Sequence, residues 1–166
     1  MKRLLTTLVI LTGLIGSGGA VWADAVDDYN KGVDAYDAGN FEEAVKWYRK
    51  AAEQGDADAQ FNLALMYDYG RGVTEDDAEA VRWYRKAAEQ GGARAQLNLG
   101  VMYYSGNGVL QDTIAAHMWF NIAAENGNGV GLANSDIAAG KLSSSDIVKA
   151  QQKAKRCMSS GYKDCD

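Results

Sequence analysis

Small and aromatic residues recur at helical spacing in the middle of the chain. In residues 44–55 they stand at steps of three, one, three and one, at Ala44, Trp47, Tyr48, Ala51 and Ala52. This spacing places them on one face of an amphipathic helix. The positions between them are charged and are expected to face solvent: Lys46, Arg49, Lys50 and Glu53. The pattern therefore predicts a helix with one buried face.

This helix is repeated twice at intervals of 36 residues. Residues 44–55 read AVKWYRKAAEQG and residues 80–91 read AVRWYRKAAEQG, so that only one position differs. Residues 116–127, AHMWFNIAAENG, keep the tryptophan, the paired alanines and the final glycine. A glycine after the last periodic residue is typical of a helix end, because the left-handed C′ conformation costs glycine little. The blocks are therefore predicted to be three copies of one helix.

A second predicted helix lies between these blocks and has the same period. Residues 59–73 read AQFNLALMYDYGRGV and residues 95–109 read AQLNLGVMYYSGNGV, again 36 residues apart. Two interleaved blocks with one period indicate helical hairpins that repeat along the chain.

Polar residues mark two of the predicted helix starts. Asn40 with Glu43, and Thr74 with Asp77, have the spacing of an N-cap followed by an acidic residue. Carboxylates there favour the positive end of the helix dipole. We therefore interpret them as structural groups rather than as general acids.

The repeated hairpins predict an all-α fold. One hairpin cannot bury both of its faces, so successive hairpins are expected to stack into a solenoid, a right-handed superhelix. Three hairpins would fill residues 24–128. Residues 129–166 are predicted to form a fourth, less regular pair of capping helices, one over Val130–Ala139 and one that begins after Ser143 with Asp146 at the capping-box position.

The positions of alanine, glycine and aromatic residues resemble the Sel1-like repeat family, a branch of the tetratricopeptide-like superfamily. The residues that carry the resemblance in the second repeat are Ala59, Gln60, Leu63, Ala64, Met66, Tyr67, Gly70, Gly72, Val73, Ala80, Trp83, Tyr84, Ala87, Ala88 and Gly91. The same set recurs over residues 95–127, with Phe120 in place of a tyrosine. The first repeat departs from it, because its shorter turn is that of an ordinary tetratricopeptide repeat.

The resemblance implies a non-enzymatic module for protein–protein interaction. In this superfamily the first helix of each pair lines the concave wall, where an asparagine often bonds the backbone of a bound peptide. The candidate binding residues on that wall are Asn30, Asn62, Asn98, Tyr29, Tyr36, Phe61, Tyr69, Arg94 and Tyr104, with Val33 and Leu65 beside them. The alternative for the three asparagines is a hydrogen bond between adjacent helices. The expected partner is another protein or a peptide segment.

The first 23 residues have the pattern of a secretory signal peptide. Lys2 and Arg3 precede an apolar run that ends at Ile15, and small residues stand before a predicted cleavage after Ala23, with Ala20 as the second choice. The alternative is a retained membrane anchor, but the apolar run is shorter than the roughly 20 residues that span a bilayer. We therefore expect an exported protein, periplasmic or secreted, with no membrane span after cleavage.

The charge of the chain argues against nucleic acid as a partner. The formal net charge is −5. Loss of the predicted leader would remove two basic residues and no acidic one, and would lower the charge further. Binding of phosphate groups or anionic membranes requires a basic face.

The cysteines predict a staple near the C-terminus. Cys157 and Cys165 are the only two in the chain. In an oxidising compartment they have one possible intramolecular pairing, a disulfide, and the alternative is two free thiols. With two cysteines and one histidine, the chain lacks the usual ligands of a zinc site, so no metal and no cofactor are predicted.

The sequence holds little that could support catalysis. His117 is the only histidine, and it takes the position of Val45 and Val81 in the repeated helix. We interpret it as a partly exposed packing residue, because no serine or cysteine lies in a nucleophile motif that could use it. No catalytic residue is therefore predicted. The alternative is a peptidoglycan- or β-lactam-related enzyme, since some exported relatives that carry a cysteine pair in each repeat have been linked to penicillin binding or hydrolysis.

Overall fold

The computed structural model describes residues 18–165, with side chains from Asp24 onward, and these residues form helices without any strand. The helices are α1 (Gly18–Asp37), α2 (Phe41–Glu53), α3 (Ala57–Asp68), α4 (Asp77–Ala88), α5 (Ala93–Ser105), α6 (Thr113–Glu125), α7 (Gly129–Ala139) and α8 (Ser144–Ser159). The predicted all-α fold is confirmed.

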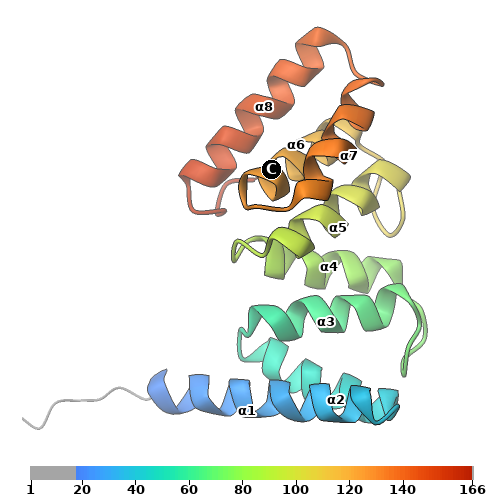
Figure 1. Ribbon diagram of the computed structural model, residues 1–166, viewed down its shortest axis with the longest axis vertical. Helices are drawn as coiled ribbons and strands as arrows, with labels where there is room; N and C mark the ends of the chain where they lie inside the picture. The colour runs from blue at the N-terminus through green and yellow to red at the C-terminus, as the bar shows by residue number, and fades with distance from the viewer. Residues whose placement is uncertain (1–17, 166) are drawn as a thin grey trace, which may run out of the picture.

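Helices that are adjacent in sequence pack against each other through most of the molecule. The pairs α1–α2, α3–α4 and α5–α6 form hairpins, and α2 and α4 contact the first helix of the next hairpin. The hairpins follow one another from α1 and α2 at one end of the molecule to α8 at the other (Figure 1). The structure is therefore the helical-repeat solenoid that the period of 36 residues predicts.

The two C-terminal helices are arranged differently from the expected fourth pair. Both α7 and α8 pack mainly against α6 rather than against each other. Each has one narrow buried stripe of small residues: Gly131, Ser135 and Ala138 in α7, and Ala150, Ala154 and Cys157 in α8. Each stripe is used against the preceding repeats, and the larger apolar side chains outside the stripes, Val130, Leu132 and Ile137 in α7 and Val148 in α8, are exposed.

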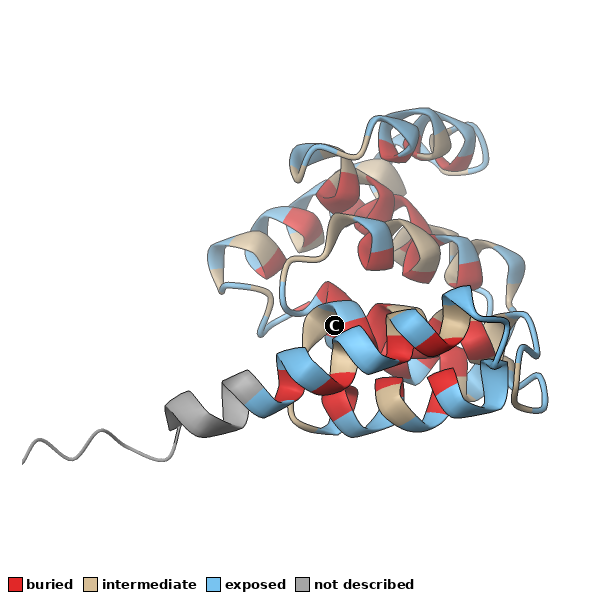
Figure 2. Cartoon of the chain, turned by 60° about the horizontal axis from the view of Figure 1, so that its bottom comes forward, coloured by how far each residue is buried: buried red, intermediate tan, exposed pale blue. Residues whose placement is uncertain are grey.

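The core is built from alanines and aromatic rings on the inner faces of the helices. Buried residues face the neighbouring helices and exposed residues face outward (Figure 2). Gly32 allows α1 and α2 to approach, since a Cβ there would lie 2.5 Å from the ring of Tyr48. Gly100 receives the ring of Phe120 in the same way, at 2.6 Å. The small residues of the first helices therefore make room for aromatic residues of the second helices.

The helix ends agree only in part with the predicted caps. The predicted pair of Thr74 and Asp77 is wrong: Asp76 is the N-cap of α4, and its side chain accepts from the amide of Glu79 at 3.0 Å. Asn40 stands at the N-cap of α2 but makes no side-chain capping bond. The predicted Ser143 cap is confirmed, since its hydroxyl accepts from the amide of Asp146. Caps that sequence reasoning missed are Asp56, Asp112 and Asn128.

Glycines in the longer turns join successive repeats. Gly72 has a left-handed φ of 68°, and a Cβ there would lie 2.3 Å from the backbone of Phe41 at the start of α2. Gly108 takes the same position one repeat later, against the backbone of Asp77 at the start of α4. Any side chain at these positions would separate a turn from the helix that it contacts, which explains the Gly-x-Gly sequence.

Two buried glutamines form equivalent hydrogen bonds one period apart. Gln60 donates to the carbonyl of Ala52 at 3.1 Å and accepts from Gln90 at 2.8 Å. Gln96 donates to the carbonyl of Ala88 at 3.0 Å and accepts from Asn126 at 2.8 Å. Each glutamine therefore ties the end of one hairpin to the start of the next. Tyr162 in the C-terminal tail continues the pattern by donating to Asn126 at 3.0 Å.

Candidate functional site

A hollow of about 390 Å³ lies between the first helices of the repeats. It is lined by residues of α1, α2, α3, the turn after α3 and the start of α5: Tyr29, Val33, Tyr36, Tyr48, Asn62, Leu65, Met66, Tyr69, Arg71 and Arg94. Five of the predicted binding residues meet there, namely Tyr29, Tyr36, Asn62, Tyr69 and Arg94. The expected neighbours Val33 and Leu65 lie between them. We call this site the α1–α3 hollow.

Tyrosine rings form much of the wall of this hollow. The rings of Tyr29 and Tyr48 have centroids 5.9 Å apart, and Tyr36 packs edge-on against Phe41. Burial raises the pKa of Tyr48 to about 12 and also raises the pKa of Tyr29. The hydroxyl groups therefore stay protonated at neutral pH, and they offer both donors and acceptors beside the aliphatic side chains.

Asn62 lies in the hollow and is also engaged within the protein. It lies beside the hydroxyls of Tyr29 and Tyr48, where its amide partly opposes the effect of burial on the pKa of each tyrosine. One repeat later, Asn98 lies beside Tyr84 in the same way, and the hydroxyl of Tyr84 donates to Asp68 at 2.8 Å. Two of the recurring asparagines therefore lie beside tyrosines of a neighbouring helix.

Two arginines stand at the rim of the hollow. Arg71 donates to the hydroxyl of Tyr36, and its guanidinium lies 5.8 Å from the ring centre of Tyr69. The guanidinium of Arg94 lies 4.3 Å from the ring centre of Phe61. Among residues 24–165, no carboxylate lies within 4.0 Å of either guanidinium. The rim is therefore locally basic, in a chain with a net negative charge.

The other predicted binding residues lie outside the α1–α3 hollow. Asn30 is exposed on α1, and Asn98 is half-buried against Tyr84. Phe61 is buried beneath Arg94 and packs against Tyr84 with ring centroids 5.9 Å apart. Tyr104 is half-buried, and the ammonium of Lys141 lies 4.4 Å from its ring centre.

Sequence reasoning missed Tyr48, Met66 and Arg71 as lining residues. The periodicity places Tyr48 on the buried face of its helix, and it is buried, but one side of its ring still borders the hollow. Arg71 lies in the Gly-x-Gly turn after α3, outside the helical faces that the periodicity predicts. The period offers a signal for it, because the equivalent position in the next repeat is Asn107. An arginine that does not recur in the next repeat, at a turn that borders the α1–α3 hollow, is a signal of a lining residue.

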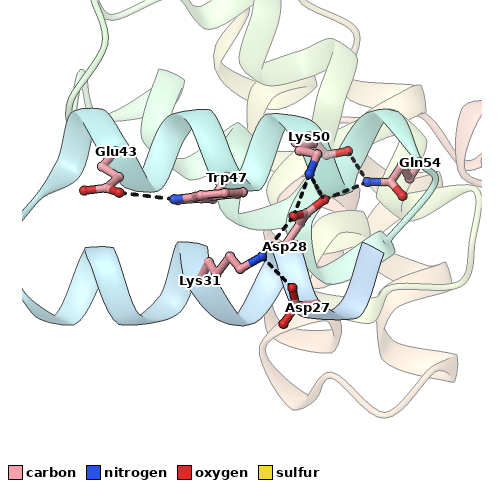
Figure 3. Close-up of polar contacts among 7 residues, drawn as sticks. All are labelled: Asp27, Asp28, Lys31, Glu43, Trp47, Lys50 and Gln54. Atoms are coloured by element: carbon pink, nitrogen blue, oxygen red, sulfur yellow. Dashed lines mark hydrogen bonds and ion pairs between the residues drawn. The ribbon is translucent and has the colours of Figure 1, made fainter. Parts of the chain in front are cut away.

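A second hollow, at the outer edge of α1 and α2, is explained by a buried charge. Figure 3 shows Lys31, Lys50 and Gln54 converging on Asp28, which is 2% exposed. Burial disfavours ionisation of this carboxyl group. The bonds from Lys50 and Gln54 and the two lysine charges outweigh burial, so the pKa of Asp28 lies below its ordinary value. The cluster is a structural network in which every charge at its centre is matched.

His117 is buried, contrary to the expectation of partial exposure. It is 3% exposed, and its Nδ1 lies 2.9 Å from the amide nitrogen of Asn121. Asn121 in turn accepts from the hydroxyl of Ser135 on α7 at 2.8 Å. The valines at the equivalent positions are buried too, which explains why this side chain points inward. The three residues form a polar link between α6 and α7.

Two features of the described residues bear on the compartment of the protein. Cys157 and Cys165 form a disulfide between α8 and the C-terminal tail, as the cysteine count predicts. Within residues 18–165, no helix is long and apolar enough to cross a bilayer. Most of the predicted signal peptide, residues 1–17, lies outside the described part of the chain. The backbone of α1 begins at Gly18 and continues past the predicted cleavage point.

Three consecutive segments of the chain match the sequence model of the Sel1 repeat. They are residues 29–56, 57–92 and 93–128, which together make up more than half of the chain. The first segment matches despite its shorter turn. Each segment runs from the first helix of one hairpin to the turn before the next, so the family repeat and the structural hairpin coincide.

Two curated relatives are each similar to a short stretch of the chain. Both are named exopolysaccharide production negative regulators. The protein from Rhizobium meliloti (strain 1021) is 50% identical over 46 residues, or 28% of this chain and 17% of its own length. The protein from Rhizobium leguminosarum bv. viciae is 49% identical over 51 residues, or 31% of this chain and 19% of its own length. The chain therefore matches less than a fifth of either relative.

Solved structures resemble the solenoid over most of its length. A protective antigen of uropathogenic Escherichia coli with an SLR fold is similar at a TM-score of 0.79 and 34% identity, covering 86% of this chain and 32% of the antigen. A Sel1 repeat protein from Oxalobacter formigenes has a TM-score of 0.66 and 38% identity, and the match covers 75% of this chain and 52% of that protein. Cysteine-rich protein B of Helicobacter pylori has a TM-score of 0.54 at 22% identity, and the match covers 70% of this chain and 98% of that protein. At this identity the likeness shows a shared fold alone. With three matched repeats and this architecture, the chain belongs to the Sel1 repeat family, whose repeats generally mediate protein–protein interaction.

Proposed function

We propose that this protein is a non-enzymatic adaptor that holds an extended segment of a partner protein in the α1–α3 hollow. The observation that carries the proposal is the hollow itself. It is lined from three successive hairpins by tyrosines and aliphatic side chains, with arginines at its rim. Aromatic and arginine side chains are the commonest anchors of protein interfaces. A surface of this composition is suited to a peptide with both apolar and polar groups.

The dimensions of the hollow favour an extended chain. Tyr29 and Tyr36 are seven residues apart on α1, and at 1.5 Å per residue their backbones lie about 10 Å apart. An extended peptide covers that length with about three residues. The hydroxyls of the hollow could bond its backbone, and Val33 and Leu65 could contact an apolar side chain. We expect the bound segment to run along the axis of α1.

We also propose that the mature protein works outside the cytoplasm, in the periplasm or after secretion. The basic start, the short apolar run and the small residues before Ala23 support export. The disulfide between Cys157 and Cys165 is consistent with an oxidising compartment. The two rhizobial relatives are named as negative regulators of exopolysaccharide production, and we extend a regulatory role to this chain as part of the proposal.

Site-specific photocrosslinking in the native host tests the proposed binding surface. A photoreactive phenylalanine analogue would replace Tyr69, which is 61% exposed at the rim of the hollow. We expect a discrete crosslinked product that contains one partner protein. The matched control places the same analogue at Arg82, an exposed residue of α4 that does not line the hollow. Equal products at both positions, or a product at Arg82 alone, would contradict binding in the hollow.

A further inference from the structure

We infer that the α1–α3 hollow selects an acidic segment of its partner, with carboxylate side chains on either side of an apolar residue. The inference rests on the proposed function, since it names the chemistry of the segment that the hollow would hold. The two carboxylates would meet Arg71 and Arg94, and the apolar side chain would lie between them against Val33 and Leu65. All four protein residues line the same hollow.

The arginines belong to this hollow and are not part of the repeat. The position of Arg94 is Asp58 one repeat earlier and Val130 one repeat later, and the position of Arg71 is Asn107 in the next repeat. By contrast, the second helices of the first two repeats differ at one position in twelve. Two arginines that border one hollow and do not recur at the equivalent positions of the other repeats mark this hollow as chemically distinct.

Both guanidinium groups are positioned without neutralisation by an acid. Arg71 is held by the hydroxyl of Tyr36, and Arg94 lies over the ring of Phe61. Such contacts orient a guanidinium group and leave its remaining N–H donors available for a carboxylate, which it can bind with two parallel hydrogen bonds. The absence of a carboxylate within 4.0 Å of either group, among residues 24–165, leaves this capacity open to a ligand.

The acidic residues nearby set the limits of the site. Asp58 and Asp56 lie close enough to Tyr29 that their charges contribute to raising its pKa, and the charge of Arg94 opposes them. Asp37, which follows Tyr36 in the chain, likewise adds to the effect of burial in raising the pKa of Tyr48. The charge of the rest of the protein is screened over about 8–10 Å at physiological salt, so the local arginines dominate at contact distance.

The spacing of an extended chain fits this arrangement. Alternate residues of an extended peptide point to the same side, and each residue advances the chain by about 3.3 Å. An apolar residue with an acidic residue two positions before it and another two positions after it presents all three side chains to one face, over about 13 Å. That length is about 3 Å more than the distance of about 10 Å between the backbones of Tyr29 and Tyr36, and two arginine side chains can reach over this difference.

Selection from a phage-displayed library of random dodecapeptides tests the inference. The purified protein without its leader would be the bait, and selected peptides would be synthesised with a fluorescent label for titration. We expect enrichment of aspartate and glutamate two positions from an apolar residue. The double variant Arg71→Gln/Arg94→Gln should weaken binding of these peptides at least tenfold. Asp58→Asn should strengthen it, because it removes a negative charge near Arg94.

A matched control removes the same charge elsewhere. The double variant Arg49→Gln/Arg82→Gln changes two exposed arginines of α2 and α4 that do not line the hollow, and it should bind within twofold of the unchanged protein. Circular dichroism would verify that all variants are folded. Selected peptides without acidic enrichment, or equal losses in both double variants, would overturn the inference and leave the proposed function in place. A selection that yields no binding peptide would overturn both.

Discussion

At the scale of single residues, the shape of the hollow depends on how the ring of Tyr48 packs. The ring of Tyr48 lies against Gly32 on one side and borders the hollow on the other. Asn62 of α3 lies beside its hydroxyl. The second repeat has Ala64 in the position of Gly32, so a methyl group at this position is compatible with the repeat.

Replacing Gly32 with alanine should destabilise the protein modestly. The added Cβ would lie 2.5 Å from the Tyr48 ring, which must move. Overpacking costs about 1–3 kcal/mol, and the better helix propensity of alanine returns about 1 kcal/mol, so we expect a net loss of about 1 kcal/mol in urea unfolding. Gly129→Ala is the control, since a Cβ at Gly129 meets nothing within 4 Å. An equal effect of both changes would disprove the proposed packing of the Tyr48 ring against Gly32.

His117 should make the stability of the protein depend on pH. Burial lowers the pKa of its imidazole in the folded protein, partly opposed by the charge of Asp136, while the unfolded chain keeps a value near 6.5. Unfolding therefore takes up a proton below that pH. The contribution of neutral His117 is complete above about pH 6.5 and is lost as the pH falls through the folded value, by up to about 1.4 kcal/mol per pH unit.

The substitution His117→Val isolates this effect, because valine fills the equivalent positions 45 and 81. Urea unfolding at pH 7.5, 6.5 and 5.5 should give a smaller loss of stability for the variant than for the unchanged protein. His117 is the only histidine, so no other imidazole adds to the difference. Parallel pH profiles of the two proteins would rule out the proposed titration.

At the scale of elements, the hairpins are joined by polar contacts as well as by packing. Gln60 and Gln96 supply one donor and one acceptor each to neighbouring hairpins, and Asp28 takes the equivalent place in the first repeat. A carboxylate is tolerated at Asp28 because its neighbours are the donors Lys50 and Gln54. At Gln60 and Gln96 the neighbour is a backbone carbonyl, which needs a hydrogen-bond donor.

Gln96→Glu should consequently destabilise the protein at neutral pH. The buried carboxylate would face the carbonyl of Ala88 without a donor, at a cost of at least about 2 kcal/mol in urea unfolding. The loss should shrink near pH 5, where the protonated acid can donate again. Gln152→Glu, on an exposed position of α8, should change stability by less than about 0.5 kcal/mol. A loss at Gln96 no larger than at Gln152 would contradict the role of the buried bond.

The disulfide should stabilise the C-terminal tail against α8. Its cysteines are eight positions apart, and closure of so short a loop contributes about 2–3 kcal/mol in the chain-entropy model. Protein from an oxidising compartment should have a mass two hydrogens below that of the reduced chain. Dithiothreitol should lower its unfolding midpoint and should leave a Cys157→Ala/Cys165→Ala variant unaffected. A midpoint that does not change on reduction would show that the bond carries no stability.

At the scale of the whole molecule, the sequence predicts the solenoid because every repeat carries the same pattern. The pairing of α7 with α8 was predicted wrongly, since two narrow stripes of small residues do not say which neighbour they face. The hollow was predicted in part: the helical face places Tyr29, Tyr36 and Asn62 together. Whether Phe61 is covered by Arg94 depends on the angle between successive hairpins, which the period does not encode.

The central claim is that the concave side between α1 and α3 binds a partner segment, and methyl NMR tests it most directly. Protein with labelled valine and leucine methyl groups would be titrated with a peptide from the display selection. The account predicts that the signals of Val33 and Leu65 in the hollow shift, while those of the exposed Leu110 and Val148 stay in place. Shifts confined to Leu110 and Val148, with Val33 and Leu65 unchanged, would contradict it.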